Sequence, residues 1–211
     1  MVYTNYYWFD SSRSPQESIE KATELLQKTL AMDDTHAPAH GNLSIIYLQK
    51  REYDKAIAEG ERAVSLDQGS PFVAFAYAKA LVYSGRPEEA IPLLEKAIRL
   101  NPLAPSPFYN HLGLAFRLTG RLEEAVALNK KSLLRAPNDF WVHAALASIY
   151  IEMGRDEEAR AAAAEVLRIS PKFSLELVDR TSLLKDRSVV DKTIDTLRKA
   201  GLPDKPPPAQ P

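Results

Sequence analysis

Small and large apolar residues follow one another along the chain in a pattern that returns about every 34 residues. A small residue is followed three positions later by a large one, which places both side chains on one face of an α-helix. A second helical block follows, with an alanine that recurs at the same period. The pattern predicts pairs of short helices packed closely through their small residues. The recurring positions are Ser44, Ala78, Gly113 and Ala147 (small), Tyr47, Leu81, Phe116 and Tyr150 (large), and Ala56, Ala90, Ala125 and Ala159.

The segment between the two helices of a pair also repeats. Gly-Arg, one variable residue and then Glu-Glu-Ala occur at residues 85–90, 120–125 and 154–159, with a weaker copy at 51–56. Glycine accepts the positive φ that ends a first helix. The acidic pair stands at the start of the second helix, where the helix dipole favours negative charge. Proline stops the second helix, and it closes the unit at Pro102, Pro137 and Pro171, with Gln68 in the corresponding position of the weaker copy.

This pattern resembles the tetratricopeptide repeat, a helix-turn-helix unit of 34 residues. The resemblance implies an all-α fold, a right-handed superhelical solenoid that forms a single domain over residues 1–203. We expect full repeats at 37–70, 71–105, 106–139 and 140–173. A degenerate first repeat is expected at 3–36, with Ala22 in the alanine position of its second helix. Its short first helix is aromatic and contains Tyr3, Tyr6, Tyr7, Trp8 and Phe9.

The period fails after Phe173, and two shorter helical segments follow. A solenoid needs an end that covers its last hydrophobic face, so we expect residues 174–203 to form a capping helix pair. In this arrangement, leucines of the pair cover the apolar side of the helix at 156–169. Residues 204–211 are expected to be a disordered, proline-rich tail. The covering leucines are Leu175, Leu177, Leu183 and Leu197.

Composition and charge narrow the classes of function. The 27 Lys and Arg residues nearly balance the 28 Asp and Glu residues, so no basic footprint for nucleic acid is expected. The chain has no cysteine, which excludes disulfides and thiolate metal sites and suits a cytoplasmic location. Residues 1–10 do not read as a secretory signal. No stretch approaches the roughly 18 apolar residues of a membrane span, so no membrane insertion by this chain is expected.

Catalytic motifs are missing from the sequence. There is no phosphate-binding GxxxxGK[ST] loop, no GxSxG elbow and no HExxH pair, and the Glu-Glu pairs follow the structural period. His36 and His40 are four residues apart, but Pro38 between them argues against one continuous helix that holds a metal. His40, His111 and His143 are expected to be packing or surface residues. The chain is therefore predicted to be no enzyme and to need no cofactor or metal.

The first helices of such repeats line the concave face of the solenoid. When these helices are projected, an apolar and aromatic groove with isolated charges results. We interpret this groove as a docking surface for a protein or peptide ligand. The alternative is that neighbouring helices or the cap pair cover much of it. The predicted groove residues are Ile45, Leu48, Phe72, Phe75, Lys79, Tyr83, Asn110, Leu114, Arg117, Trp141, Ser148 and Glu152.

Both ends of the chain carry residues that the helical repeat does not require. The tail residues Phe-Ser-Leu-Glu at 173–176, Leu-Lys-Asp at 184–186 and Leu-Arg-Lys-Ala-Gly-Leu-Pro at 197–203 resemble the tail that follows such repeats in bacterial class III adenylate/guanylate cyclases. Tyr-Tyr-Trp-Phe at 6–9 resembles the first unit in those proteins and in related winged-helix regulators. This implies the interaction region of a bacterial signalling protein. The alternative is a self-association module, with a possible homo-oligomer, of a transcriptional regulator or a stand-alone adaptor.

Overall fold

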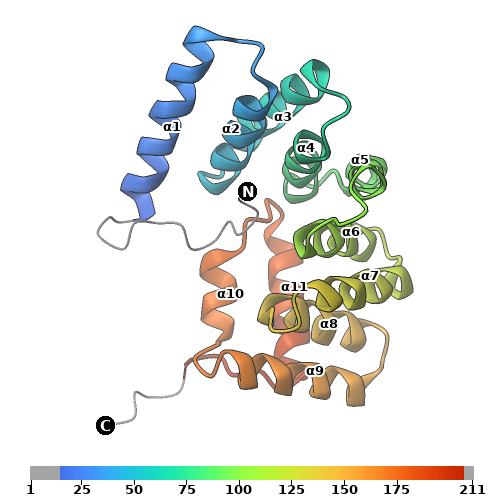
Figure 1. Cartoon of the computed structure of the whole chain (residues 1–211). Helices are drawn as coiled ribbons and strands as arrows, with labels where there is room; N and C mark the ends of the chain where they lie inside the picture. The colour runs from blue at the N-terminus through green and yellow to red at the C-terminus, as the bar shows by residue number, and fades with distance from the viewer. Residues whose placement is uncertain (1–14, 207–211) are drawn as a thin grey trace.

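The structure is a computed structural model that describes residues 15–206, in which eleven α-helices and no strands are found. Consecutive antiparallel pairs stack into a curved array (Figure 1). This confirms the predicted all-helical solenoid. The helices are α1 (Pro15–Met32), α2 (Ala37–Gln49), α3 (Tyr53–Leu66), α4 (Pro71–Tyr83), α5 (Pro87–Leu100), α6 (Ser106–Leu118), α7 (Leu122–Arg135), α8 (Phe140–Glu152), α9 (Asp156–Ile169), α10 (Leu175–Thr181) and α11 (Arg187–Lys199).

The turn inside each pair has the geometry that the glycine pattern predicts. The backbone φ is +88° at Gly85, +79° at Gly120 and +71° at Gly154. Arg51 adopts φ +59° in the weaker copy, so this residue accepts the same left-handed conformation without being glycine. The residue after each positive-φ residue donates its N–H to the backbone carbonyl of the large residue of the first helix. Arg86, for example, donates to the Leu81 carbonyl at 2.9 Å. This bond closes the helix end.

The residues that follow the glycine have a second role that the sequence pattern does not reveal. Each arginine pairs with the second glutamate of its own acidic pair, three residues on; Arg86 Nε lies 2.6 Å from Glu89 Oε1. The same pair recurs as Arg121–Glu124 and Arg155–Glu158. These groups are about half exposed, so each pair adds little stability. The second glutamate of each acidic pair is therefore part of the turn.

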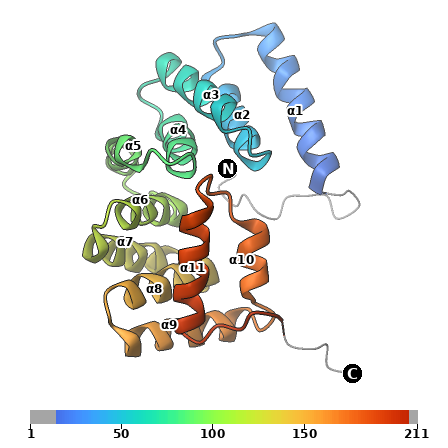
Figure 2. The ribbon, with the colours of Figure 1, turned by 180° about the vertical axis from the view of Figure 1, so that it is seen from behind.

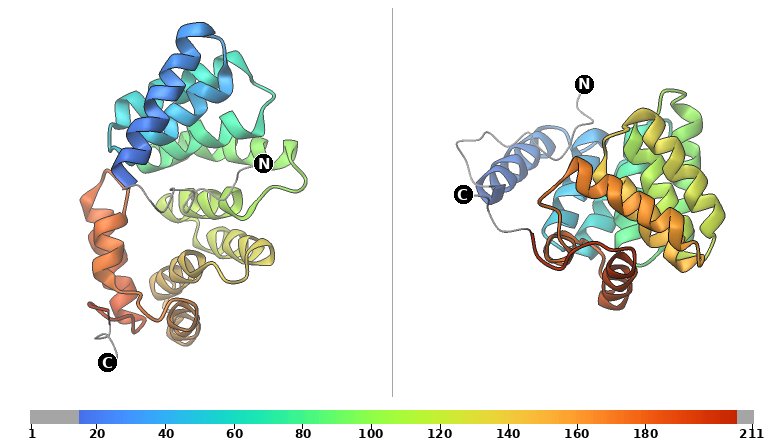
Figure 3. Two further views of the ribbon diagram at one scale, coloured as in Figure 1. Left: turned by 60° about the vertical axis from the view of Figure 1, so that its left-hand side comes forward. Right: turned by 90° about the horizontal axis from the view of Figure 1, so that it is seen from below.

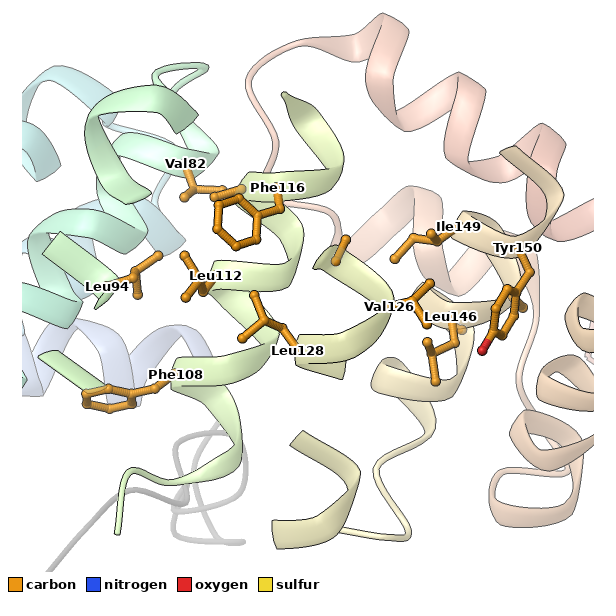
Figure 4. Packing of buried hydrophobic residues seen from close by; sticks show 14 of the residues in the cluster. Val82, Leu94, Phe108, Leu112, Phe116, Val126, Leu128, Leu146, Ile149 and Tyr150 are labelled. Carbon is orange, nitrogen blue, oxygen red and sulfur yellow. The ribbon is translucent and has the colours of Figure 1, made fainter. Parts of the chain in front are cut away.

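The predicted small positions lie in tight contacts between paired helices. Ala56, Ala90, Ala125 and Ala159 are completely buried. A Cβ atom added at Gly113 would lie 2.6 Å from the Asn129 amide nitrogen and 3.3 Å from the Ala125 carbonyl oxygen. Large side chains fill the space beside these contacts. The main core cluster runs from α4 to the C-terminal pair (Figure 4), and it includes Val82, Leu94, Phe108, Leu112, Phe116, Leu128 and Ile149.

The N-terminal end departs from the regular stack. Helix α1 packs on α2, but Ala22 is only half-buried and Leu25 and Met32 are exposed. The expected aromatic first helix of the degenerate repeat lies outside the described residues. In the part of the chain that the structure describes, no helix is long and apolar enough to cross a membrane.

The C-terminal pair differs from the expected cap in one leucine. Helix α11 packs on α8 and lies along the side of the stack (Figures 2 and 3). Leu175 and Leu197 join the core cluster that also contains Val166 of α9. Leu183 instead packs with Leu48 and Ala80, far along the stack from α9.

The end of the cap also lies further along the chain than expected. Asp204 is expected in the disordered tail, but its carboxylate accepts hydrogen bonds from Arg198, and its carbonyl accepts one from the Glu176 N–H at 3.2 Å. The carbonyl of Pro203 likewise accepts from the Leu175 N–H at 2.9 Å. The segment that follows α11 therefore pairs with the start of α10 and ties the C-terminal pair together.

Candidate interaction surface

The first helices α2, α4, α6 and α8 form one side of the stack, which we call the inner face. Helix α11 runs across the part of it that α6 and α8 form (Figure 2). The loop between α10 and α11 reaches further and contacts the start of α3 and the end of α4. There the Tyr53 hydroxyl donates to the Leu183 carbonyl at 3.1 Å, and the Lys185 N–H donates to the Tyr83 carbonyl at 2.8 Å. The inner face thus already holds a helical segment of its own chain.

A polar cluster centred on Arg117 and Glu152, which we call the docking network, attaches α11. Arg117 Nε lies 2.8 Å from Glu152 Oε1, and the side chains are only 8% and 10% exposed. The Arg117 guanidinium also donates to the Ser148 hydroxyl at 2.7 Å and to the Thr193 hydroxyl at 3.1 Å. Three of the predicted groove residues therefore lie together, with α11 as their partner.

Two further contacts complete the docking network from the side of α11. The hydroxyls of Ser148 and Thr196 are hydrogen-bonded to each other, and Lys192 Nζ lies 3.1 Å from Glu152 Oε2. Only Val190, Thr196 and Leu197 of α11 are buried. Helix α11 is thus held by hydroxyl and charged groups as much as by apolar area. This part of the predicted groove is covered by the cap pair, which is the alternative interpretation of the sequence.

The part of the inner face beyond α11 carries an aromatic cluster on α4 and α6. We call Phe75, Tyr83, Phe108 and His111 the aromatic site. The Phe75 ring stacks on Phe108 with a centroid distance of 4.4 Å, and the His111 ring meets Phe75 edge-on at 5.2 Å and Tyr83 at 5.7 Å. The sequence predicts that Phe75 stands out in the groove, but it is 5% exposed because it stacks in this cluster.

Burial lowers the pKa values of two side chains in this region. Lys79 is buried one turn from Phe75, and burial lowers the pKa of its ammonium group to about 8. Burial, followed by the charge of Lys79, lowers the pKa of His111 to about 3, so its imidazole is neutral at pH 7. His111 Nδ1 lies 2.7 Å from the Pro107 carbonyl oxygen. A carbonyl can only accept, so Nδ1 carries the proton and Nε2 is left as an acceptor.

The remaining predicted groove residues differ in how deeply they are buried. Leu48 is fully buried and Ile45 is 8% exposed, so both belong to the packing between repeats. Phe72, Asn110 and Leu114 are half-buried. Trp141 is 36% exposed and meets the edge of Phe173 with a centroid distance of 5.8 Å.

The other histidines have local partners. His36 caps α2 and accepts from the Ala39 N–H, and His40 Nδ1 lies 2.6 Å from Glu59 Oε2. His143 Nε2 lies 3.0 Å from the Pro137 carbonyl oxygen. Within residues 15–206, no three His, Asp or Glu side chains gather as a metal site would require. His36 is thus the cap of α2, and His40 is a buried residue bonded to Glu59.

Sequence reasoning misses several residues of this surface. A single histidine near a helix start gives no sign of its neighbours, so neither His111 nor Phe108 stands out as part of a site. Lys192, Thr193 and Thr196 lie beyond the last repeat, where no period fixes which face a side chain belongs to. The one available signal is the tail sequence itself, which the repeat does not need.

Solved structures with a similar fold support the solenoid. The chain matches "PilW, widely conserved type IV pilus biogenesis factor" with a TM-score of 0.71 at 20% identity over 88% of this chain and 82% of that one. It matches TTC0263, a thermophilic TPR protein in Thermus thermophilus, with a TM-score of 0.65 at 26% identity over 79% and 90% of the two chains. MamA matches with a TM-score of 0.62 at 22% identity over 74% and 91%.

Sequence comparison gives the family. A comparison with curated protein sequences gives no match. Two family models, both described as tetratricopeptide repeat, match residues 16–71 and 75–140 and residues 117–175. Together they span most of the helices described above. The chain belongs to the tetratricopeptide-repeat family.

Proposed function

We propose that this chain is a non-catalytic scaffold that binds a protein or peptide segment on the part of the inner face that α11 leaves uncovered. Proteins of this repeat family are interaction scaffolds, and a structural relative at 18% identity, YrrB, is described as a TPR protein with an unusual peptide-binding site. The observation that carries the proposal is α11 itself. A helical segment is attached to the inner face through the docking network, so this face has the chemistry to hold one.

The uncovered part supplies what a second segment needs. Phe72, Tyr83 and Leu114 are half-buried apolar residues of this part, and aromatic anchors often dominate binding energy. Asn110 adds a half-buried polar group from α6. A partner there would lie next to α11 on the same face.

Selection of peptides from a displayed library tests this function. Peptides selected on the full chain should bind at least about tenfold more weakly to Asn110→Ala, which removes a half-buried polar group of the inner face. The matched control Leu134→Ala removes an 82% exposed side chain of α7 and should leave binding unchanged. Selected peptides that lose affinity for Leu134→Ala, and keep it for Asn110→Ala, would contradict the proposed surface.

We also propose that this scaffold is the interaction region of a bacterial signalling protein such as a class III nucleotide cyclase. The residues of the resemblance are those that build the C-terminal pair. Ser174 caps α10, Asp186 caps α11, Leu197 and Leu202 are buried, and Gly201 adopts φ +99°. Because the residues of the resemblance have these structural roles, it supports a tail that folds back onto the repeats in the same way in this chain and in those cyclases. A reading frame that encodes a cyclase domain before this chain is the expected result, and one that encodes none refutes this assignment.

Self-association is the second candidate, and one observation favours it. Met32, Leu103 and Leu134 are 90%, 77% and 82% exposed. Exposed large apolar side chains are typical of contact surfaces. Light scattering over a range of concentrations tests this candidate. A molecular mass that rises with concentration supports it, provided that the double variant Leu103→Ser with Leu134→Ser has a lower mass at the same concentrations. A monomer at all concentrations refutes it.

A further inference from the structure

One edge of the stack carries large apolar side chains that the described part of the chain leaves exposed. It lies at the ends of α5 and α7 and at the loop that joins α5 to α6. Leu103 in this loop and Leu134 near the end of α7 are largely exposed. Arg135 Nη2 lies 3.4 Å from the Pro102 carbonyl oxygen, so the end of α7 lies against the loop that carries Leu103. The two leucines therefore belong to one surface, which we call the leucine edge.

The leucine edge is also basic. Lys130 and Lys131 lie one turn before Leu134 on the exposed side of α7, and Arg99 and Arg135 lie in the last turns of α5 and α7. Within residues 15–206, these four cations form no ion pair, whereas the arginine that precedes each of the two helices does. The leucine edge thus combines exposed apolar area with unpaired positive charge.

The helix dipole explains only part of this charge. A cation in the last turn of a helix is favoured, which accounts for Arg99 and Arg135. It does not account for the two lysines of α7 or for leucines that face solvent. The last two turns of α7 contain no acidic residue, and those of α5 contain one, Glu95. Positive charge therefore prevails over the whole leucine edge.

Cations beside exposed leucines fit an anionic lipid surface. Such a surface attracts Lys and Arg to its headgroups, accepts apolar side chains at the boundary below them, and needs no shaped pocket. A symmetric contact between two copies would bring the cations of both leucine edges together, which like charge opposes. Nucleic acid would attract the cations through its phosphates, but the leucines would gain nothing there.

We propose that the leucine edge docks onto an anionic membrane surface, with Leu103 and Leu134 in the headgroup region and Arg99, Lys131 and Arg135 at the lipid phosphates. This is contact with one leaflet, whereas no helix of the described residues could span the membrane. The inner face belongs to the first helices, so this contact is separate from the proposed scaffold function.

Cosedimentation of the full chain with lipid vesicles tests the inference. The probes are vesicles of phosphatidylcholine alone and of an equal mixture of phosphatidylcholine and phosphatidylglycerol. Each cation near an anionic surface contributes about fivefold to binding, so the mixed vesicles should bind at least about tenfold more tightly. Salt at about 1 M, which shortens the Debye length to about 3 Å, should remove most of this preference.

Paired substitutions locate the contact. Arg99→Gln with Lys131→Gln should weaken binding to the mixed vesicles at least about tenfold. The matched control Arg86→Gln with Arg121→Gln makes the same change in net charge roughly 15–20 Å away, at the other ends of α5 and α7, and should leave binding nearly unchanged.

The apolar half of the contact has its own variant. Leu103→Ser with Leu134→Ser should weaken binding to the mixed vesicles about tenfold. Both side chains are exposed, so the melting temperature should stay the same and the loss cannot be assigned to unfolding.

Several results would overturn the inference. These are equal binding to the two kinds of vesicle, equal losses from the two charge variants, and vesicle binding that ignores the serine variant. Polyglutamate that binds as tightly as the mixed vesicles, with no effect of the serine variant, would identify an acidic protein as the partner instead. A light-scattering mass that depends on the leucines, without vesicle binding, would assign them to self-association. Peptide binding that depends on Asn110 tests the scaffold function separately.

Discussion

Replacement of Arg117 by methionine should destabilise the C-terminal pair strongly. The Arg117 and Glu152 side chains are 8% and 10% exposed, so the carboxylate of Glu152 would remain in place without its main partner. Breaking a buried pair in this way costs about 3–5 kcal/mol. Lys192 still reaches Glu152, and it is 65% exposed, so we expect a cost near the lower value, about 3 kcal/mol.

The hydroxyl groups of the docking network do not add greatly to this cost. Ser148 keeps its bond to Thr196, and the Thr193 hydroxyl keeps its bond to the Val189 carbonyl at 2.8 Å. For a chain of this size, a loss of about 3 kcal/mol lowers Tm by about 6–12 °C. Urea denaturation and a thermal scan measure the change, and hydrogen exchange should show that the amides of α11 lose protection first.

Two variants make this prediction refutable. Arg121→Met breaks an exposed pair with Glu124 and should change stability little. The double variant Arg117→Met with Glu152→Met removes both charges and should recover most of the loss, because methionine tolerates a buried site. If Arg117→Met has no larger effect than Arg121→Met, or if the double variant is as unstable as the single one, the docking network does not hold α11.

Three further predictions concern the stack, the buried lysine and the C-terminal pair. Ala125→Leu should lower the unfolding free energy by about 1–3 kcal/mol, because Ala125 is completely buried against α6. The control Glu123→Ala should have little effect, and equal effects of the two variants in urea denaturation would refute the helix register. The folded pKa of Lys79, about 8, lies below its ordinary 10.5, so the unfolded chain binds more protons between these values and stability should rise with pH there. Lys79→Met should remove this rise, and a pH profile unchanged by the substitution would contradict the burial. Removal of residues 174–211 exposes the docking network and the core beside Leu175 and Leu197, so Tm should fall by about 10 °C; an equally stable, monomeric product would show that the pair is an independent appendage.

The repeating part of the fold is predictable because each recurring residue has a local cause. The glycine position specifies a positive φ, and the alanine position specifies a close helix contact. Both appear in the structure at Gly85, Gly120 and Gly154 and at the four buried alanines. Even Arg51, which breaks the pattern, keeps the backbone conformation because the rest of its turn forms the same hydrogen bond from Glu52 to the Tyr47 carbonyl.

The location of α11 is not predictable in the same way. Apolar residues of the cap pair suit any apolar face, and Leu183, which is expected on α9, packs with Leu48 instead. Burial cannot be read from helix projection either: Leu48 and Phe75 lie on first helices as expected, but neighbours cover them. Which side chains cover a face depends on contacts between segments far apart in sequence, such as Arg117 with Thr193, 76 residues apart.

The position of α11 on the inner face is the central claim, and an introduced disulfide tests it most directly. The chain has no cysteine, so Ser148→Cys with Thr196→Cys creates a single possible pair. The two hydroxyls are hydrogen-bonded to each other, so the two side chains point toward one another, as the sulfur atoms of a disulfide must. Mild oxidation should give an intramolecular bond in nearly all molecules, detected by mass spectrometry, while a pair of Ser148→Cys with the exposed Thr181→Cys should give none. A folded protein in which the first pair stays reduced would contradict the docking of α11.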